Sequence, residues 1–378
     1  MLVPLARRTL LHDWQRFLPA ALAIAFSGLL VLVQVALLVG LFSTISLYIT
    51  ASTGDLWVGF PGTQTIDTGR PIRAGAEVFL HRHPAVARVE RLQWTGGDWR
   101  APKGDRGGVS VILTGIDTRP GSGVLARAVT PAQRQRLMEP GSILVDAADL
   151  GKLGVTVGDS GEIGGRRVRV VGVTEGMRAI GGVNVIASLE TAATLGSAAD
   201  GDDVAYFVVS LHPGHDAETV QRELQHLATG RPFEIWTAPD FAERTVTYWM
   251  FESGMGVSVA FGSAVALLVG IVITSQTLSA AIAGSIREYA TLRALGVSVG
   301  DLRRIVLAQA LWLAFGGLLL AAALGAGLLW LAHAQRVPVR VDGGLVLATV
   351  AVVLTVALAS SLFALRQLRH ADPVLLLR

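Results

Sequence analysis

The chain has 378 residues, of which 51% are hydrophobic and 16% are charged. Soluble domains usually carry about a quarter charged residues, so a lipid bilayer is expected to solvate much of this chain. The net charge of +3 is too small to indicate nucleic-acid binding, and the lack of cysteine excludes disulfides and thiolate-bound metals.

The N-terminal part of the chain predicts a surface helix followed by a membrane span. Residues 1–16 have the pattern of an amphipathic helix on the cytoplasmic surface, and Arg7 and Arg8 precede an apolar run. Residues 17–50 form that run, which is far longer than the apolar part of a signal peptide and has no clear cleavage site. About 20 apolar residues cross a bilayer, so we predict transmembrane helix 1 with a stalk that extends beyond the membrane.

Residues 51–252 predict a large α+β domain outside the cytoplasm. Alternating or β-branched runs at 55–60, 86–94, 109–115, 205–211 and 233–236 are typical of strands. Apolar residues at helical spacing predict helices at 72–81 and 216–227. A glycine-rich section predicts a β-rich subdomain at about 120–203, inserted in the mixed one, with a mobile loop at 177–184.

Three further apolar segments follow the outer domain. They span 253–285, 305–331 and 344–365, and none contains Asp, Glu, Lys or Arg. A cytoplasmic loop at 286–304 and a short outer loop at 332–343 separate them, and residues 366–378 form a tail. The predicted fold class is therefore an α+β membrane protein with four transmembrane helices and one large domain between helices 1 and 2.

The basic residues set the orientation of the spans, because short cytoplasmic loops are rich in Lys and Arg. Ten arginines lie in the N-terminus, the 286–304 loop and the tail: Arg7, Arg8, Arg16, Arg287, Arg293, Arg303, Arg304, Arg366, Arg369 and Arg378. Both termini are therefore predicted to be cytoplasmic. The region 51–252 is mildly acidic, which agrees with a position on the opposite side.

The second span contains glycines that let another helix approach closely. They are Gly254, Gly256, Gly262 and Gly270. Small residues in a membrane helix favour tight helix contacts, so these four are candidates for a dimer interface. A crowded bundle within one chain would explain them equally well.

The sequence contains no energy source of its own. Charged residues inside spans usually mark proton or ion relays, and here the spans have none. Lys152 follows Gly151, but the remaining residues of a phosphate-binding loop are missing around it. No nucleophile elbow appears, so no catalytic residues are predicted. The pairs His81 with His83 and His212 with His215 lack a third ligand, and no metal site is predicted.

The loop between spans two and three is the most informative segment. Residues 285–296 predict a helix that ends at Gly296, a usual C-terminal cap. Ile286, Tyr289, Leu292 and Leu295 recur every three residues and form one apolar stripe. Such a short stripe beside a membrane can dock into a groove on another protein. A helix that lies on lipid headgroups would also suit this basic loop.

Two motifs resemble those of a known membrane family. Residues 287–296, REYATLRALG, look like the coupling helix of the FtsX-like permease superfamily, which includes the MacB and LolC/LolE proteins. Residues 372–378, DPVLLLR, look like its C-terminal signature. The order of one span, a large outer domain and three spans also resembles this family. The resemblance assigns contact with an ATPase to Ile286, Arg287, Glu288, Tyr289, Leu292, Arg293, Leu295 and Gly296.

A finer likeness is to the DevC-type exporters. Residues 23–28, 33–34, 41–42 and 55–58 are similar to the first span and first outer strand of that group. Residues 99–102 resemble its Trp-x-x-Pro segment. The likeness is weakest at 120–203, where recognition of cargo or partner is expected to diverge.

The resemblance implies a homodimeric permease of the bacterial inner membrane that works with two copies of a separate ATPase. This chain would hold no cofactor, because ATP and Mg²⁺ would bind to the partner. It would move a lipid, glycolipid, drug or haem outward by mechanotransmission, in contact with membrane lipid and with a periplasmic adaptor and an outer-membrane channel. The alternative is an FtsX-like regulator that activates an external enzyme without moving cargo. The cytoplasmic segments are too short for the output domain of a sensor.

Overall fold

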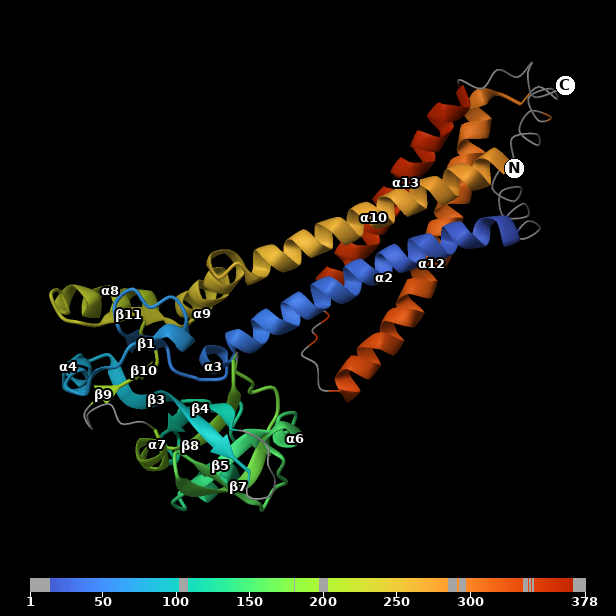
Figure 1. Cartoon of the computed structure of the whole chain (residues 1–378). Helices are drawn as coiled ribbons and strands as arrows, with labels where there is room; N and C mark the ends of the chain where they lie inside the picture. Colours follow the sequence, from blue (N-terminus) through green and yellow to red (C-terminus); the bar gives the residue numbers. More distant parts are fainter. Residues whose placement is uncertain are drawn as a thin grey trace. The chain divides into compact units, whose positions relative to one another are not determined.

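The computed structural model describes residues 14–369, except 102–107, 180, 197–202, 285–290, 292–296, 336–338, 340 and 342 (Figure 1). The predicted surface helix at 1–16 therefore lies largely outside the described residues. The chain divides into two compact units. One comprises Met1–Gly40 and Gly256–Arg378, and the other comprises Leu41–Met255.

Four long helices make up the first unit. They are α2 (Trp14–Ile45), α10 (Met255–Gly284), α12 (Val299–Ala334) and α13 (Gly343–Arg369) (Figure 1). Among the described residues, three stretches are long and apolar enough to cross a membrane: Leu18–Ile45, Met255–Thr277 and Leu307–Ala334. In α13 the apolar stretch Gly343–Val356 is shorter. Three predicted spans are thus supported by length and composition, and the fourth stays a prediction.

Helix α2 packs against its neighbours through small residues. A methyl group on Gly28 would lie 3.1 Å from Val353 of α13 and 3.6 Å from Ala321 of α12. On α12, a methyl group on Gly317 would lie 2.6 Å from Ile24. Each of these glycines therefore marks a place where two helix backbones approach closely.

The second unit begins with a four-stranded antiparallel sheet and two helices. In chain order its elements are β1 (Leu56–Gly59), α4 (Ala76–His81), β3 (Val86–Arg100), β10 (Tyr206–Leu211), α8 (Ala217–Leu227) and β11 (Glu234–Thr237). The strands lie in the order β11-β1-β10-β3. This order and the βαββαβ sequence of elements are those of a ferredoxin-like unit. All five predicted strands fall on observed strands, and Leu56, Trp57 and Val58 are fully buried.

The two helices of this ferredoxin-like unit cover one face of its sheet. Leu80 of α4 and Leu224 of α8 belong to the same apolar cluster as Leu56 and Val58 of β1. Helix α8 begins where predicted, because Asp216 caps it by accepting a hydrogen bond from the backbone N–H of Thr219 at 2.9 Å. The cap and the buried apolar stripe together confirm the predicted helix.

The predicted helix at 72–81 is wrong in its first part. Ile72–Arg73 form strand β2, which pairs with β9 (Asp203–Val204), and the helix begins only at Ala76. The β-branched Ile72 is 4% exposed and lies in the apolar cluster beneath the sheet. Pairing with a distant strand therefore decided its conformation.

The rest of the outer domain is a closed six-stranded barrel. Its further strands are β4 (Val109–Ile116), β5 (Ser142–Asp146), β6 (Ser160–Ile163), β7 (Arg166–Thr174) and β8 (Val183–Ser188). Pairings run from β3 through β4, β8, β5, β7 and β6, and the pair Trp99 and Ile163 returns the sheet to β3. Closure removes the exposed edges that an open sheet would present.

The long strand β3 belongs to both halves of the domain (Figure 1). Its first part pairs with β10 of the ferredoxin-like unit, and its second part, from Gln93, pairs with β4 of the barrel. The barrel therefore begins before the predicted boundary at residue 120. Its outer helices are α5 (Pro131–Leu137), α6 (Leu150–Leu153) and α7 (Leu189–Leu195).

The barrel interior has no room for a side chain at Gly161. Trp99 is 1% exposed, its indole N–H donates to the Leu153 carbonyl at 3.1 Å, and its ring covers Gly161. We expect Gly161→Ala to lower the free energy of unfolding by about 1–3 kcal/mol, because the fixed ring cannot move aside. Gly151→Ala on α6, where a methyl group meets no atom within 4 Å, should not destabilise the protein. Denaturant unfolding of the full chain, followed by fluorescence, measures the free energy of unfolding of both variants. An equal decrease in the two would contradict this prediction.

Candidate functional site

The predicted coupling segment lies outside the described residues except for Thr291. Its candidates Ile286, Arg287, Glu288, Tyr289, Leu292, Arg293, Leu295 and Gly296 all fall in the excluded ranges. The next described element begins directly after them. Ser298 caps α12 by accepting a hydrogen bond from the N–H of Asp301 at 3.1 Å. The assignment of these residues stays a prediction.

Two of the four candidate dimer glycines face α2 of the same chain. A methyl group on Gly262 would lie 3.1 Å from Gln34 Nε2, and one on Gly270 would lie 2.5 Å from Ser27 Oγ. Gly254 has a φ of +75°, in the left-handed region that turns use, and a methyl group there would meet no atom within 4 Å. Gly256 is buried. The packing of Gly262 and Gly270 within one chain is the alternative that the sequence left open.

The extension of transmembrane helix 1 beyond the membrane, which we call the first stalk, ends in the core of the outer domain. Helix α2 ends at Ile45, and the short helix α3 (Leu47–Thr50) follows. Tyr48 and Ile49 are 2% and 1% exposed and belong to a cluster that also contains Trp57 and Phe241. The ring of Tyr48 meets the edge of Trp94, with 4.7 Å between centroids. We call residues 46–53 the stalk base.

The segment that leads from the outer domain to α10, which we call the second stalk, contacts the stalk base in the same core. Helix α9 (Ala238–Thr247) contacts α3 and leads through the π-helical turn Tyr248–Glu252 towards α10. Phe241 of α9 stacks on Trp236 at 4.8 Å and is fully buried. The two chain segments that connect the outer domain to the helical unit are therefore held together at their outer ends.

A loop of the barrel is hydrogen-bonded to the stalk base through its residues 123–127. We call residues 117–129 the clasp loop. The Thr53 N–H donates to the Gly123 carbonyl and the Arg127 N–H donates to the Ala51 carbonyl, both at 2.9 Å. The Leu125 N–H donates to Ser52 Oγ at 3.0 Å, and the Arg127 guanidinium donates to the Thr50 carbonyl at 2.8 Å. The stalk base and the clasp loop thus form one hydrogen-bonded strip.

A second barrel loop, predicted to be mobile, is anchored at both ends. Met177 is fully buried, and its N–H donates to Asp146 Oδ2 at 2.9 Å. Asn184 donates to the Met177 carbonyl at 3.0 Å and accepts a hydrogen bond from Thr114 at 2.9 Å. Met177 is buried in the same cluster as Tyr48, so the start of this loop is packed, and the mobility of the loop stays a prediction.

Burial perturbs the ionisable groups near the stalk base. It raises the pKa of the Tyr48 phenol well above its usual value, with a further contribution from nearby acidic groups that include Asp146. Burial also raises the pKa of Asp146, although two backbone N–H groups oppose the shift. For Asp117, burial is outweighed by hydrogen bonds from Arg119, and the pKa is lowered. The shifts of Tyr48 and Asp146 both favour the neutral form of the buried group, as expected in a structural core.

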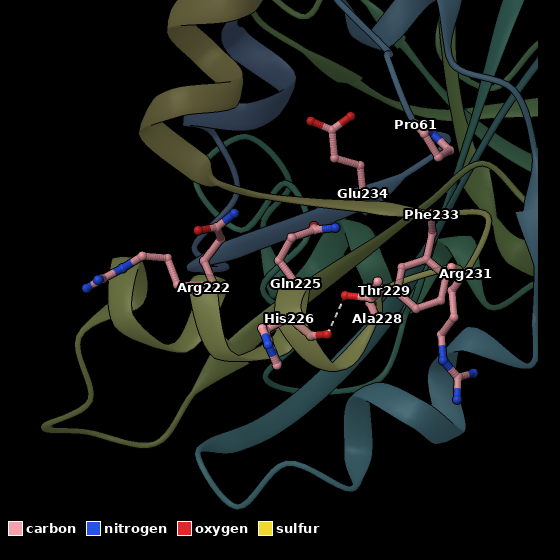
Figure 2. Close-up of a pocket in the computed structure, with 11 residues that line it drawn as sticks. Pro61, Arg222, Gln225, His226, Ala228, Thr229, Arg231, Phe233 and Glu234 are labelled. Carbon is pink, nitrogen blue, oxygen red and sulfur yellow. Dashed lines mark hydrogen bonds between the residues drawn. The ribbon is translucent and has the colours of Figure 1, made fainter.

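A shallow groove of about 620 Å³ lies beside β11 (Figure 2). Gln221 donates to the Ile235 carbonyl at 2.8 Å, and Gln225 accepts from its N–H at 2.9 Å, so α8 satisfies the outer edge of the strand. Figure 2 shows Arg222 and Arg231 pointing in different directions from the two ends of the groove. The groove presents no convergent set of polar groups for a ligand.

The histidine pairs have ordinary surroundings. His83 Nε2 lies 3.2 Å from Glu223, and His215 Nδ1 lies 3.2 Å from the His212 carbonyl. Within the ranges that the structure describes, no three His, Cys, Asp or Glu residues gather as metal ligands.

Sequence reasoning missed the residues that join the stalk base to the barrel. Tyr48 lies within the apolar run of the first span, and the clasp loop lies in the section where the sequence gives the weakest family likeness. No local pattern marks hydrogen bonds between segments about 70 residues apart. Only the three-dimensional pairing brings them together.

Comparison with known families agrees with this architecture. Residues 17–227 match the MacB-like periplasmic core domain, and residues 260–373 match the FtsX-like permease C-terminal domain. The chain belongs to the MacB/FtsX-like permease family. Members of this family are transmembrane permease components of ABC transporters, with an inner-membrane part and a periplasmic domain. The finer likeness to DevC-type exporters stays a prediction.

Two solved structures similar to this MacB/FtsX-like chain are outer domains. The periplasmic region of MacB from Actinobacillus actinomycetemcomitans is 13% identical, with a TM-score of 0.38, and the match covers 52% of this chain and 94% of that one. The extracellular domain of the ABC-type transporter YknZ from Gram-positive bacteria is 14% identical, with a TM-score of 0.35, and the match covers 49% and 100%. Among curated protein sequences, none matches this chain significantly.

Proposed function

We propose that this chain is the permease subunit of an ATP-driven exporter that works by mechanotransmission. The observation that carries the proposal is the stalk base, where the end of the first membrane helix is part of the outer domain's core and contacts α9. A displacement of these helices by a cytoplasmic motor would therefore move the outer domain directly. No continuous pore is needed for such a mechanism.

The motor would be a separate ABC ATPase, bound in two copies to a homodimer of this chain. Ile286, Tyr289, Leu292 and Leu295 would fill its groove, and ATP and Mg²⁺ would bind to that partner only. Family membership supports the ATPase partnership. A hydrophobic or amphiphilic cargo, such as a lipid, glycolipid, drug or haem, would suit the apolar membrane unit. A periplasmic adaptor and an outer-membrane channel would complete the export route.

The same linkage would also serve an FtsX-like regulator. In that case the stalks would move the outer domain to activate an extracytoplasmic enzyme, and no cargo would cross. A deletion strain distinguishes the two functions. Accumulated cargo with normal cell-wall growth supports export, whereas a cell-wall defect with unchanged export supports regulation.

Copurification tests the shared premise of both functions. We expect the full chain, extracted in mild detergent from its own cells, to bring down an ABC ATPase in a ratio of two permeases to two ATPases. The complex should hydrolyse ATP faster than the ATPase alone. An extracted chain that captures no ATPase, and changes the activity of none, would overturn the assignment.

A further inference from the structure

The clasp loop is held by charged side chains as well as by the stalk base. Glu90 of β3 is 1% exposed, and its Oε2 accepts hydrogen bonds from the N–H groups of Gly123 at 2.8 Å and Val124 at 3.1 Å. Charge-assisted hydrogen bonds of this kind are stronger than neutral ones. The ferredoxin-like unit therefore holds the centre of the loop.

A buried arginine holds the same loop from the barrel side. Arg134 of α5 is 6% exposed, and it donates to the Asp117 carbonyl at 2.7 Å and also to the Val124 carbonyl. Burial lowers the pKa of Arg134, while the charges of Glu90 and Asp117 oppose that shift. The ferredoxin-like unit therefore binds Val124 through its N–H, and the barrel binds it through its carbonyl.

The backbone of the clasp loop adopts a conformation that is unfavourable without the contacts around it. Leu125 has a φ of +52° and is the only described residue other than glycine with a positive φ. Its side chain is fully buried, and its N–H is bonded to Ser52 of the stalk base. A large side chain persists in this left-handed region only where its surroundings fix it.

We propose that the clasp loop is the rigid link that carries displacement of the first stalk to the barrel, with Glu90 and Arg134 as its positioning residues. The proposal rests on the proposed function, because it gives a path for the motion that the ATPase would drive. Both side chains contact the loop where it crosses from stalk to barrel.

Spin labels on the full chain test whether these residues hold the loop. The protein has no cysteine, so Thr50→Cys on the stalk base and Val157→Cys on the barrel, both exposed, give one specific pair. We expect a narrow distance distribution in the parent protein. It should widen roughly twofold in Glu90→Gln, which replaces the charged acceptor with a neutral amide, and in Arg134→Gln, which removes the donor to two buried carbonyl groups of the loop.

A matched control separates the loop from a general loss of charge. Glu77 of α4 is paired with Arg91 of β3 at 2.6 Å, and its side chain hydrogen-bonds to Arg91 and not to the clasp loop. Glu77→Gln removes one carboxylate from an arginine pair, as Glu90→Gln does for Glu90 and Arg88, whose side chains lie 3.3 Å apart. Its distance distribution should equal that of the parent. If all three variants give the parent distribution, Glu90 and Arg134 do not position the loop, and the proposal is overturned.

The ratio of cargo moved to ATP hydrolysed tests the transmission step. In Glu90→Gln and Arg134→Gln we expect this ratio to fall about tenfold while ATP hydrolysis by the complex continues. A wider distance distribution with an unchanged ratio would overturn the transmission role. If the parent chain itself neither binds an ATPase nor moves cargo, the proposed function fails, and with it the transmission role, whereas the label distances still decide whether the clasp is rigid.

Discussion

Replacing Leu292 with aspartate is expected to abolish capture of the ATPase and, with it, export. In the proposed coupling helix Leu292 occupies the middle of the apolar stripe between Tyr289 and Leu295. A central apolar anchor in a helix-in-groove contact typically contributes at least about 2 kcal/mol, which corresponds to an affinity loss of about 30-fold. A buried, unpaired carboxylate adds to that loss. Binding of the purified ATPase to the reconstituted variant measures it.

Ala294→Asp is the matched control for this prediction. Ala294 lies two residues further on, so in a helix it faces away from Leu292. It introduces the same charge into the same loop, and it should leave binding within about twofold if only the stripe is buried. Equal loss in both variants would indicate a general effect of negative charge at a basic membrane surface, and would favour a helix that lies on lipid headgroups.

Local patterns in the sequence predicted much of the fold because local physics determines those parts. Long apolar runs predicted helices that the structure places at Trp14–Ile45, Met255–Gly284 and Val299–Ala334. Alternating β-branched residues located β1, β3, β4, β10 and β11. Apolar residues at helical spacing located α8, and the structure adds that Asp216 caps its first turn.

Long-range pairings were beyond such patterns. Closure of the barrel depends on Trp99 lying opposite Ile163, and no periodicity in either strand encodes that register. The same holds for Ile72, whose strand partner Val204 lies far along the chain. The clasp loop is the clearest example. Glu90 and Arg134 are charged, and charged residues are usually expected on the solvent-exposed surface. Only the structure, which places both side chains against the clasp loop, shows that they are buried.

The arrangement of the outer domain favours transfer of motion over deformation. The strand β3 runs through the ferredoxin-like unit and the barrel, so the two halves share a continuous hydrogen-bonded element. The stalk base contacts both halves through the cluster that contains Tyr48 and through the clasp loop. Packed interiors transmit displacement because they have little free volume to absorb it. Under the proposed mechanism, we therefore expect a tilt of the stalks to reorient the outer domain.

Gly270→Leu is expected to disrupt the helical unit of each chain before it affects any dimer. A methyl group at this position would already lie 2.5 Å from Ser27 Oγ and 3.5 Å from the Ser27 backbone Cα. Three further carbons cannot fit unless α2 and α10 separate, which should cost at least about 1–3 kcal/mol. The fraction of the chain that stays folded in detergent on heating, followed by tryptophan fluorescence, measures this loss.

Gly316→Leu provides the comparison, because Gly316 is an exposed helical glycine of α12 with no atom within 4 Å of an added methyl group. It adds the same bulk to a membrane helix and should leave stability unchanged or slightly higher, since leucine favours helix more than glycine does. If Gly270 instead lined a dimer interface, Gly270→Leu would yield folded monomers of parental stability. Cross-linking of the extracted protein separates these outcomes, because packing within one chain predicts loss of fold and a dimer interface predicts loss of association alone.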